Sequence, residues 1–238
     1  MADGKRIHLA LLWHMHQPPY EDPRTGVFLL PWTYLHATKD YYDMGEVVRR
    51  HPRMRTNFNF TPSLLWQLEQ YRTGALADQT LEVLGRPLDQ LKLADREFVM
   101  RTCFGINPDT MIARFPRYRE LHERFRAFPT PLDAALQFGI EDYRDLSVLY
   151  LLAWSGPTLH RDARIAALVA KGRDYSDDDR QQVLACGREL IGNIVPLYCD
   201  LAAQGLIELS TSPFHHPLTP LIVSNECAVE ASPGLPLP

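Results

Sequence analysis

The residues with the clearest chemical potential are two histidines separated by one residue, His14 and His16, in the segment HMHQPPY. Side chains alternate along a β-strand, so histidines at this spacing point to the same face. Such a pair can bind a metal, hydrogen-bond a substrate, or close the polar end of a core strand. No second HxH or HxxE motif accompanies the pair. The pattern therefore favours a role in a substrate or catalytic site and leaves the metal and structural alternatives open.

Two further segments repeat this design. The segment MRTNFNF at 54–60 places Asn57 and Asn59 on one face of a predicted strand, and LIELST at 206–211 does the same with Glu208 and Ser210. In a parallel α/β barrel, the loops after the strands converge and form the active site. We therefore expect the polar ends of three strands to form one site. Glu208 is predicted to be a buried carboxylate, and such a group needs a partner or a function.

The remaining pattern predicts the elements that position these residues. Residues 7–13 are almost continuously apolar, as expected of a strand buried on both faces of a parallel sheet. The Pro-rich, aromatic segment at 17–44 is predicted to be irregular, with a helical turn near its end. Thr61 and Pro62 start a helix that Gly74 ends.

Residues 85–200 are predicted to be mostly helical, with an amphipathic helix over 141–154. Ser176 and Asp179 form a capping box at the start of the clearest helix. Pro196 is expected to kink or split that helix, and Gly205 to end it.

Composition limits the class of protein. The 238 residues suit one large domain or two small ones, and the net charge of −4, with acids and bases interspersed, argues against a nucleic-acid partner. The four scattered cysteines predict reduced thiols and a cytoplasmic location. The N-terminal KRIHLALLWHM lacks the cleavage site of a signal peptide, and no apolar run reaches the roughly 20 residues that span a membrane. We expect no membrane partner.

In combination, these motifs resemble glycoside hydrolase family 57, the group of α-amylases, 4-α-glucanotransferases and amylopullulanases. His16-Gln17-Pro18 matches the first motif of that family, at the end of the first barrel strand. GLIELSTSPFHHPLTPLI, which starts at Gly205, matches the second motif. Three further segments resemble those of family members that carry a long insertion: LPWTYLHATKDYYDM, FNFTPSLLWQL and LLAWSGP.

The resemblance implies a fold class and a set of site residues. The expected fold is α/β, an incomplete (β/α)7 barrel that spans residues 1–238, with a large helical insertion at roughly 85–200 between the second and third strands. The expected substrate is an α-glucan or maltooligosaccharide, with no cofactor and no bound metal. The predicted substrate-binding residues are His14, His16, Gln17, Trp32, Asn59, Glu208 and His216.

The reaction that the resemblance implies is retaining cleavage or transfer of α-glucosidic bonds, which requires two carboxylates about 5–5.5 Å apart. In the family, the nucleophilic glutamate and the acid/base aspartate follow the second motif. Glu226 and Glu230 lie too close to that motif to match them, so the resemblance places both catalytic residues beyond Pro238, the last residue of the sequence. We therefore expect a truncated chain, with an open sheet edge, that is inactive by itself. Two alternatives remain: a metal-dependent carbohydrate hydrolase or deacetylase that uses His14 and His16, and a non-catalytic glucan-binding module.

Overall fold

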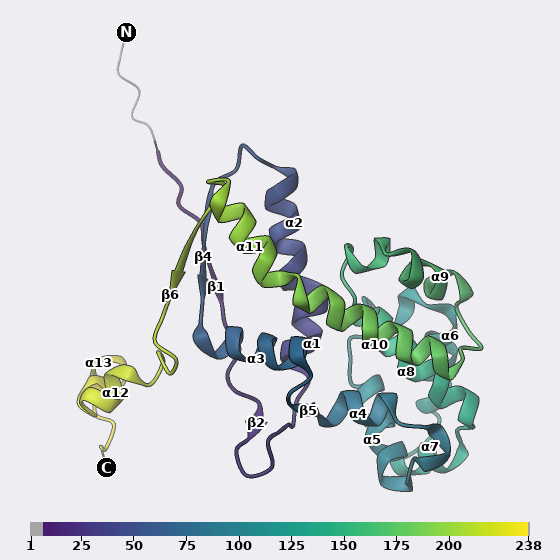
Figure 1. Cartoon of the computed structure of the whole chain (residues 1–238). Helices are drawn as coiled ribbons and strands as arrows, with labels where there is room; N and C mark the ends of the chain where they lie inside the picture. Colours follow the sequence, from purple (N-terminus) through teal and green to yellow (C-terminus); the bar gives the residue numbers. More distant parts are fainter. Residues whose placement is uncertain (1–6, 238) are drawn as a thin grey trace.

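A parallel sheet of three strands holds the polar segments predicted from the sequence. The computed structural model describes residues 7–237. The strands are β1 (Leu12–Met15), β4 (Thr56–Phe60) and β6 (Ile207–Thr211), in the order β1-β4-β6 (Figure 1). His14 lies opposite Asn59, and Asn59 lies opposite Ser210. The second and third predicted strands are confirmed, and the register brings their polar residues to one face.

The first strand differs from its prediction. It begins at Leu12 rather than at residue 7, and burial on both faces is wrong, since Leu12 is 64% exposed and Trp13 is 44% exposed. The physical reason is its position at the edge of the sheet. β4 pairs with one side of β1, and no strand among residues 7–237 pairs with the other.

The Pro-rich aromatic segment is more regular than its composition suggests. β2 (Glu21–Asp22) pairs antiparallel with β3 (Val27–Phe28), which pairs parallel with β5 (Ala77–Asp78) in a second small sheet. Residues 32–50 are helical throughout, in α1 (Trp32–His36), the π-helical turn η1 (Ala37–Tyr41) and α2 (Tyr42–Arg50). The prediction of an irregular loop was wrong here, because buried side chains such as Phe28 and Tyr34 hold the segment against the core.

Helices cover the apolar face of the three-stranded sheet. α3 (Pro62–Thr73) follows β4 directly and ends at Gly74, which has a φ of 68° and the left-handed conformation expected of a C-cap glycine. Phe58 and Phe60 meet the ring of Tyr198, on α11 (Ile194–Ala203), edge to face at 4.9 and 4.7 Å. These residues alternate with Asn57 and Asn59, so the face that carries His14 lies on the opposite side of the sheet.

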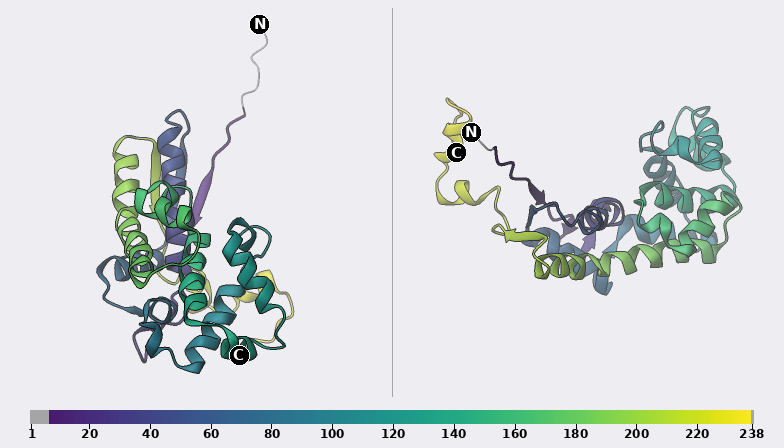
Figure 2. Two further views of the ribbon diagram at one scale, coloured as in Figure 1. Left: turned by 90° about the vertical axis from the view of Figure 1, so that its right-hand side faces the viewer. Right: turned by 90° about the horizontal axis from the view of Figure 1, so that it is seen from above.

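A helical body lies beside the sheet and confirms the predicted helical region (Figures 1 and 2). Its longest buried helix, α8 (Ile140–Trp154), has twelve of its fifteen residues buried, so the predicted amphipathic character is wrong for this central helix. The other elements of the body are α4 (Gln79–Gly85), η2 (Leu88–Gln90), α5 (Leu93–Phe104), η3 (Ile112–Arg114), α6 (Pro116–Phe125), α7 (Pro131–Gln137), η4 (Leu159–Arg161), α9 (Ala163–Lys171) and α10 (Asp177–Gly192).

The long helix that returns to the sheet begins and divides as the sequence predicts. The backbone N–H of Asp179 donates to the Ser176 hydroxyl at 3.1 Å, and the Ser176 N–H donates to the Asp179 carboxylate at 2.7 Å. α10 ends at Gly192 and α11 starts at Ile194, with Pro196 in the first turn of α11. Proline is tolerated there because the first N–H groups of a helix have no intrahelical acceptor.

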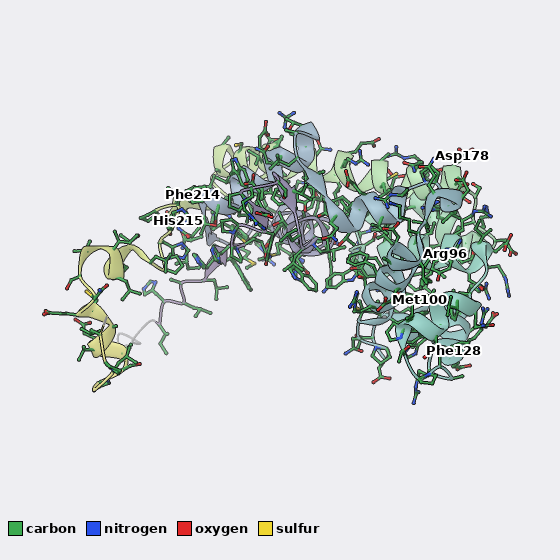
Figure 3. The ribbon with its side chains drawn as sticks, turned by 90° about the horizontal axis from the view of Figure 1, so that it is seen from below. Arg96, Met100, Phe128, Asp178, Phe214 and His215 are labelled. Carbon is green, nitrogen blue, oxygen red and sulfur yellow. The ribbon has the colours of Figure 1, made fainter. Side chains whose placement is uncertain are left out.

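The chain leaves β6 in an arm with two short helices, α12 (Thr219–Val223) and α13 (Cys227–Ala231), which projects away from the sheet (Figures 1 and 2). Figure 3 places Phe214 and His215 at the base of this arm, at the other end of the molecule from Arg96 and Phe128 of the helical body.

The fold is therefore mixed α/β, mostly helical, with two small sheets. Residues 7–237 form no closed barrel. In the same range, no helix is both long enough and apolar enough to cross a membrane. Cys103, Cys186, Cys199 and Cys227 are all free thiols, as the sequence predicts.

Pro238, beyond which the catalytic pair is expected, lies outside the described residues. The expectation that the nucleophile and the acid/base follow Pro238 therefore stays a prediction. Within the described part of the arm, Glu226 comes directly before α13 and Glu230 lies within it, and both are exposed. Neither residue belongs to a strand of the sheet.

Candidate functional site

Three histidines meet at the carboxyl end of the parallel sheet. The rings of His14 and His16 are stacked with centroids 5.6 Å apart, and His216 stands edge-on to them at 4.9 and 5.0 Å. An extended chain would separate the side chains of His215 and His216, but residues 214–218 form turns, with the His216 N–H bonded to the Pro213 carbonyl. This turn brings His216 to the pair on β1. We refer to His14, His16 and His216 as the histidine cluster.

Asn59 connects the histidine cluster to the other two strands. Its side-chain oxygen lies 2.8 Å from His14 Nδ1 and also accepts a hydrogen bond from the Ser212 hydroxyl at 3.0 Å. Its Nδ2 donates to the Ser210 hydroxyl at 3.1 Å. Asn59 is only 8% exposed, so these bonds replace water around a buried amide. Ser212 did not emerge from the sequence pattern, although it lies two residues after Ser210.

The hydrogen bonds constrain the proton on one side of His14. Asn59 Oδ1 is an acceptor, so His14 carries a proton on Nδ1. His14 Nε2 lies 3.2 Å from His216 Nε2, and one of these two nitrogens donates to the other. His216 Nδ1 is buried and has no hydrogen-bond partner in the described part of the chain.

The surroundings of His16 favour its neutral form. Burial lowers its pKa, and the positive charges that His216 and His14 would carry when protonated lower it further. A neutral imidazole has one donor and one acceptor nitrogen, which suits hydrogen bonding to hydroxyl groups.

Gln17 lies beside the histidine cluster, but its side chain turns toward the protein. Its Nε2 donates to the Tyr41 hydroxyl at 2.7 Å, and its Oε1 accepts from the Tyr20 hydroxyl at 2.6 Å. Its backbone carbonyl accepts from the Ser63 hydroxyl at 2.9 Å. These contacts fix the loop that follows β1. A direct role of Gln17 in substrate binding stays a prediction.

Glu208 lies on the polar face of the sheet, but it is exposed and not buried as predicted. It lies opposite Asn57, two residues before Ser210, which places it about 7 Å from the level of Asn59 along the strand. Glu208 is exposed, and its carboxylate has no hydrogen bond or ion pair within residues 7–237. The prediction of burial was wrong because this part of the sheet face is open, beside a cavity of about 440 Å³ that Leu11 and Arg55 also line.

Trp32 belongs to a neighbouring group of aromatic residues. It is 36% exposed and lies edge-on to Trp154 at 5.8 Å, with His36 at 6.4 Å. The ring of His36 lies 6.3 Å from that of Tyr41, whose hydroxyl contacts the backbone carbonyl of His16. Trp32 is therefore connected to the histidine cluster through intervening rings rather than by direct contact. Trp154, from the helical body, was not singled out by the sequence.

The alternative of a metal-dependent enzyme requires several ligand side chains that surround one point. Over residues 7–237, no three or more His, Cys, Asp or Glu side chains are arranged so that they could hold a metal ion.

The fold and the site together define a class of protein: a mixed α/β protein with a cluster of polar side chains at the carboxyl ends of parallel strands. Comparison with protein families gives the particular family. The family model "Glycosyl hydrolase family 57" matches residues 10–231, and the chain belongs to this family. The resemblance inferred from the two motifs is thereby confirmed. Neither a curated protein nor a solved structure matches the chain significantly.

Proposed function

We propose that this chain forms one wall of the sugar-binding site of an enzyme that cleaves or transfers α-glucosidic bonds with retention. In this proposal, β1, β4 and β6 are three strands of a (β/α)7 barrel, and residues between β4 and β6 are its helical insertion. The observation that carries the proposal is the network centred on Asn59, which joins polar side chains from three strand ends at one point. Family membership supports a carbohydrate substrate.

The chemistry of the histidine cluster suits a glucan. Sugar hydroxyls are both donors and acceptors, and neutral imidazoles can satisfy both roles. Trp32 presents part of an indole ring to solvent, and we assign it to apolar contact with a pyranose ring.

The carboxylates limit what these residues can do by themselves. A retaining mechanism needs two carboxylates about 5–5.5 Å apart. Glu208 is the one acidic residue in the three strands of the sheet. We therefore propose that the 238-residue chain binds α-glucans without turning them over, and that Glu208 contributes to binding. A catalytic pair would come from residues outside this sheet.

Calorimetric titration of the purified chain with maltotriose tests the proposal, with cellotriose as the β-linked control. We expect saturable binding of maltotriose that His14→Ala and His16→Ala each weaken by at least about tenfold. His51→Ala, at an exposed histidine that makes no side-chain hydrogen bond in the described structure, is the matched control. Absence of binding, or an equal effect of His51→Ala, would contradict the binding site. Release of reducing sugar from maltooligosaccharides would contradict the lack of turnover.

A further inference from the structure

A second cavity lies in the helical body, away from the histidine cluster. Its volume is about 570 Å³, and η1, η3 and the segment between α8 and η4 line it. Lys39, Arg114, His160 and Arg161 are among its lining residues, and no aspartate or glutamate is. The whole chain carries a net charge of −4, so the positive charge of this cavity is opposite in sign to that of the chain.

The two arginines of this cavity are not neutralised by the protein. No carboxylate among residues 7–237 lies within ion-pair distance of Arg114 or Arg161. Other arginines of the helical body do have acidic partners: Arg117 pairs with Asp145, and Arg164 pairs with Glu189. The charges of Arg114 and Arg161 therefore remain available to an anion.

Two carboxylates near the cavity make contacts with other groups. Asp43 accepts hydrogen bonds from the backbone N–H and the hydroxyl of Thr158. Asp40 lies 3.9 Å from Lys39 Nζ, but its other oxygen is bonded to His36 at 2.6 Å. Lys39 is therefore shared with Asp40, and the proposed site relies chiefly on Arg114 and Arg161.

Lys39 also packs against Trp154, a buried residue that does not line the cavity. The Lys39 ammonium lies 5.3 Å from the centre of the Trp154 ring, and Trp154 in turn contacts the partly exposed Trp32. Cationic groups bind phosphate. A cavity of this size also exceeds the needs of a single inorganic ion and fits a small organic molecule.

We propose that this cavity binds the phosphate ester of a sugar, with Arg114, Arg161 and Lys39 on the phosphate and the sugar in the remaining volume beside Ser155 and His160. The ester is either a free sugar phosphate or a phosphorylated glucose unit within a glucan. The site uses none of the residues of the histidine cluster, so it does not depend on the proposed glucan site.

Isothermal titration calorimetry of the full chain tests this site. Glucose 6-phosphate represents the free sugar phosphate, and phosphorylated maltodextrin represents a phosphorylated glucose unit within a glucan. Glucose, maltotriose and inorganic phosphate are the reference ligands. We expect at least one ester to bind more tightly than all three, with an affinity that falls as salt is raised. Failure of both esters to bind, or binding of inorganic phosphate as tightly as the better ester, overturns the proposal.

Matched variants locate the binding. Arg114→Gln with Arg161→Gln should weaken binding of the ester by about tenfold or more, because two charge-assisted contacts are lost. Arg119→Gln with Arg126→Gln removes the same charge at exposed positions outside the cavity and should change the affinity much less. Equal weakening by the two pairs overturns the proposal. His14→Ala should leave ester binding intact while it reduces maltotriose binding, so failure of one site is distinguished from failure of the other.

Discussion

His14 Nδ1 lies 2.8 Å from Asn59 Oδ1, so an amide on β4 fixes both the orientation and the tautomer of an imidazole on β1. The two residues are 45 positions apart in the sequence and directly opposite in the sheet. Because Asn59 also bonds to Ser210 and Ser212, this one side chain sets the relative positions of all three strand ends. The polar site therefore depends on a buried amide as much as on the histidines.

Asn59→Ala is expected to lower the free energy of unfolding by about 1–3 kcal/mol, because it leaves His14 and two serines without a buried partner. It should also weaken maltotriose binding, since His14 loses its fixed tautomer. Chemical denaturation and calorimetric titration measure the two effects. Asn57→Ala is the matched control, on the same face of the same strand and without a side-chain hydrogen bond in the described structure. Equal losses in the two variants would show that Asn59 has no special position.

The histidine cluster should make the protein sensitive to acid. Since burial and the neighbouring histidines lower the pKa of His16, the unfolded chain binds a proton at this residue more readily than the folded chain does. This contribution to stability is present above about pH 6.5 and is lost as the pH falls from there through the lowered pKa. NMR titration of the His16 ring should give a pKa below 6.5 that rises in His216→Gln. An unchanged pKa in that variant would contradict the coupling.

The sequence predicted the strands and their polar face because alternation along a strand is a local property. Asn57 and Asn59, or Glu208 and Ser210, must share a face once the strand exists. The sequence predicted that the polar ends of the strands would meet at one end of a barrel, but it did not predict which residues pair. The structure places His14 and Asn59 in direct contact.

Other features depend on contacts that the sequence does not encode locally. His216 reaches the histidine cluster through a turn, so its direction could not be read from the spacing of His215 and His216. The exposure of Glu208 follows from the absence of packing over that part of the sheet, and the Trp154 contact with Trp32 joins segments more than 100 residues apart. These are tertiary effects, which strand periodicity alone does not specify.

The helical body should depend on one buried ion pair more than on its surface charges. Arg117 Nε lies 2.8 Å from Asp145, which is 1% exposed and also accepts the Tyr175 N–H at 3.0 Å. Asp145→Ala is expected to lower the free energy of unfolding by about 1–3 kcal/mol, because the Tyr175 N–H loses its acceptor and Arg117 keeps only Asp142 as a buried partner. Glu120→Ala removes an exposed partner of the same arginine and should cost about 1 kcal/mol or less. Urea denaturation compares the two, and similar losses would contradict the distinction.

Close packing of α1 against α10 leads to opposite predictions for two glycines of one helix. Tyr34, 2% exposed, lies so close to Gly187 that an added Cβ would collide with the Tyr34 hydroxyl and lie 2.7 Å from its Cζ. Gly187→Ala should therefore lower the free energy of unfolding by about 1–3 kcal/mol. At Gly192, the nearest atom to an added Cβ is the flexible Arg72 Cγ at 3.4 Å, so Gly192→Ala should be neutral or stabilise by up to about 1 kcal/mol. Thermal unfolding followed by circular dichroism measures both. Tolerance of Gly187→Ala without loss of stability would mean that Tyr34 can move, and Tyr34→Phe combined with Gly187→Ala, which removes the colliding hydroxyl, should recover part of the loss.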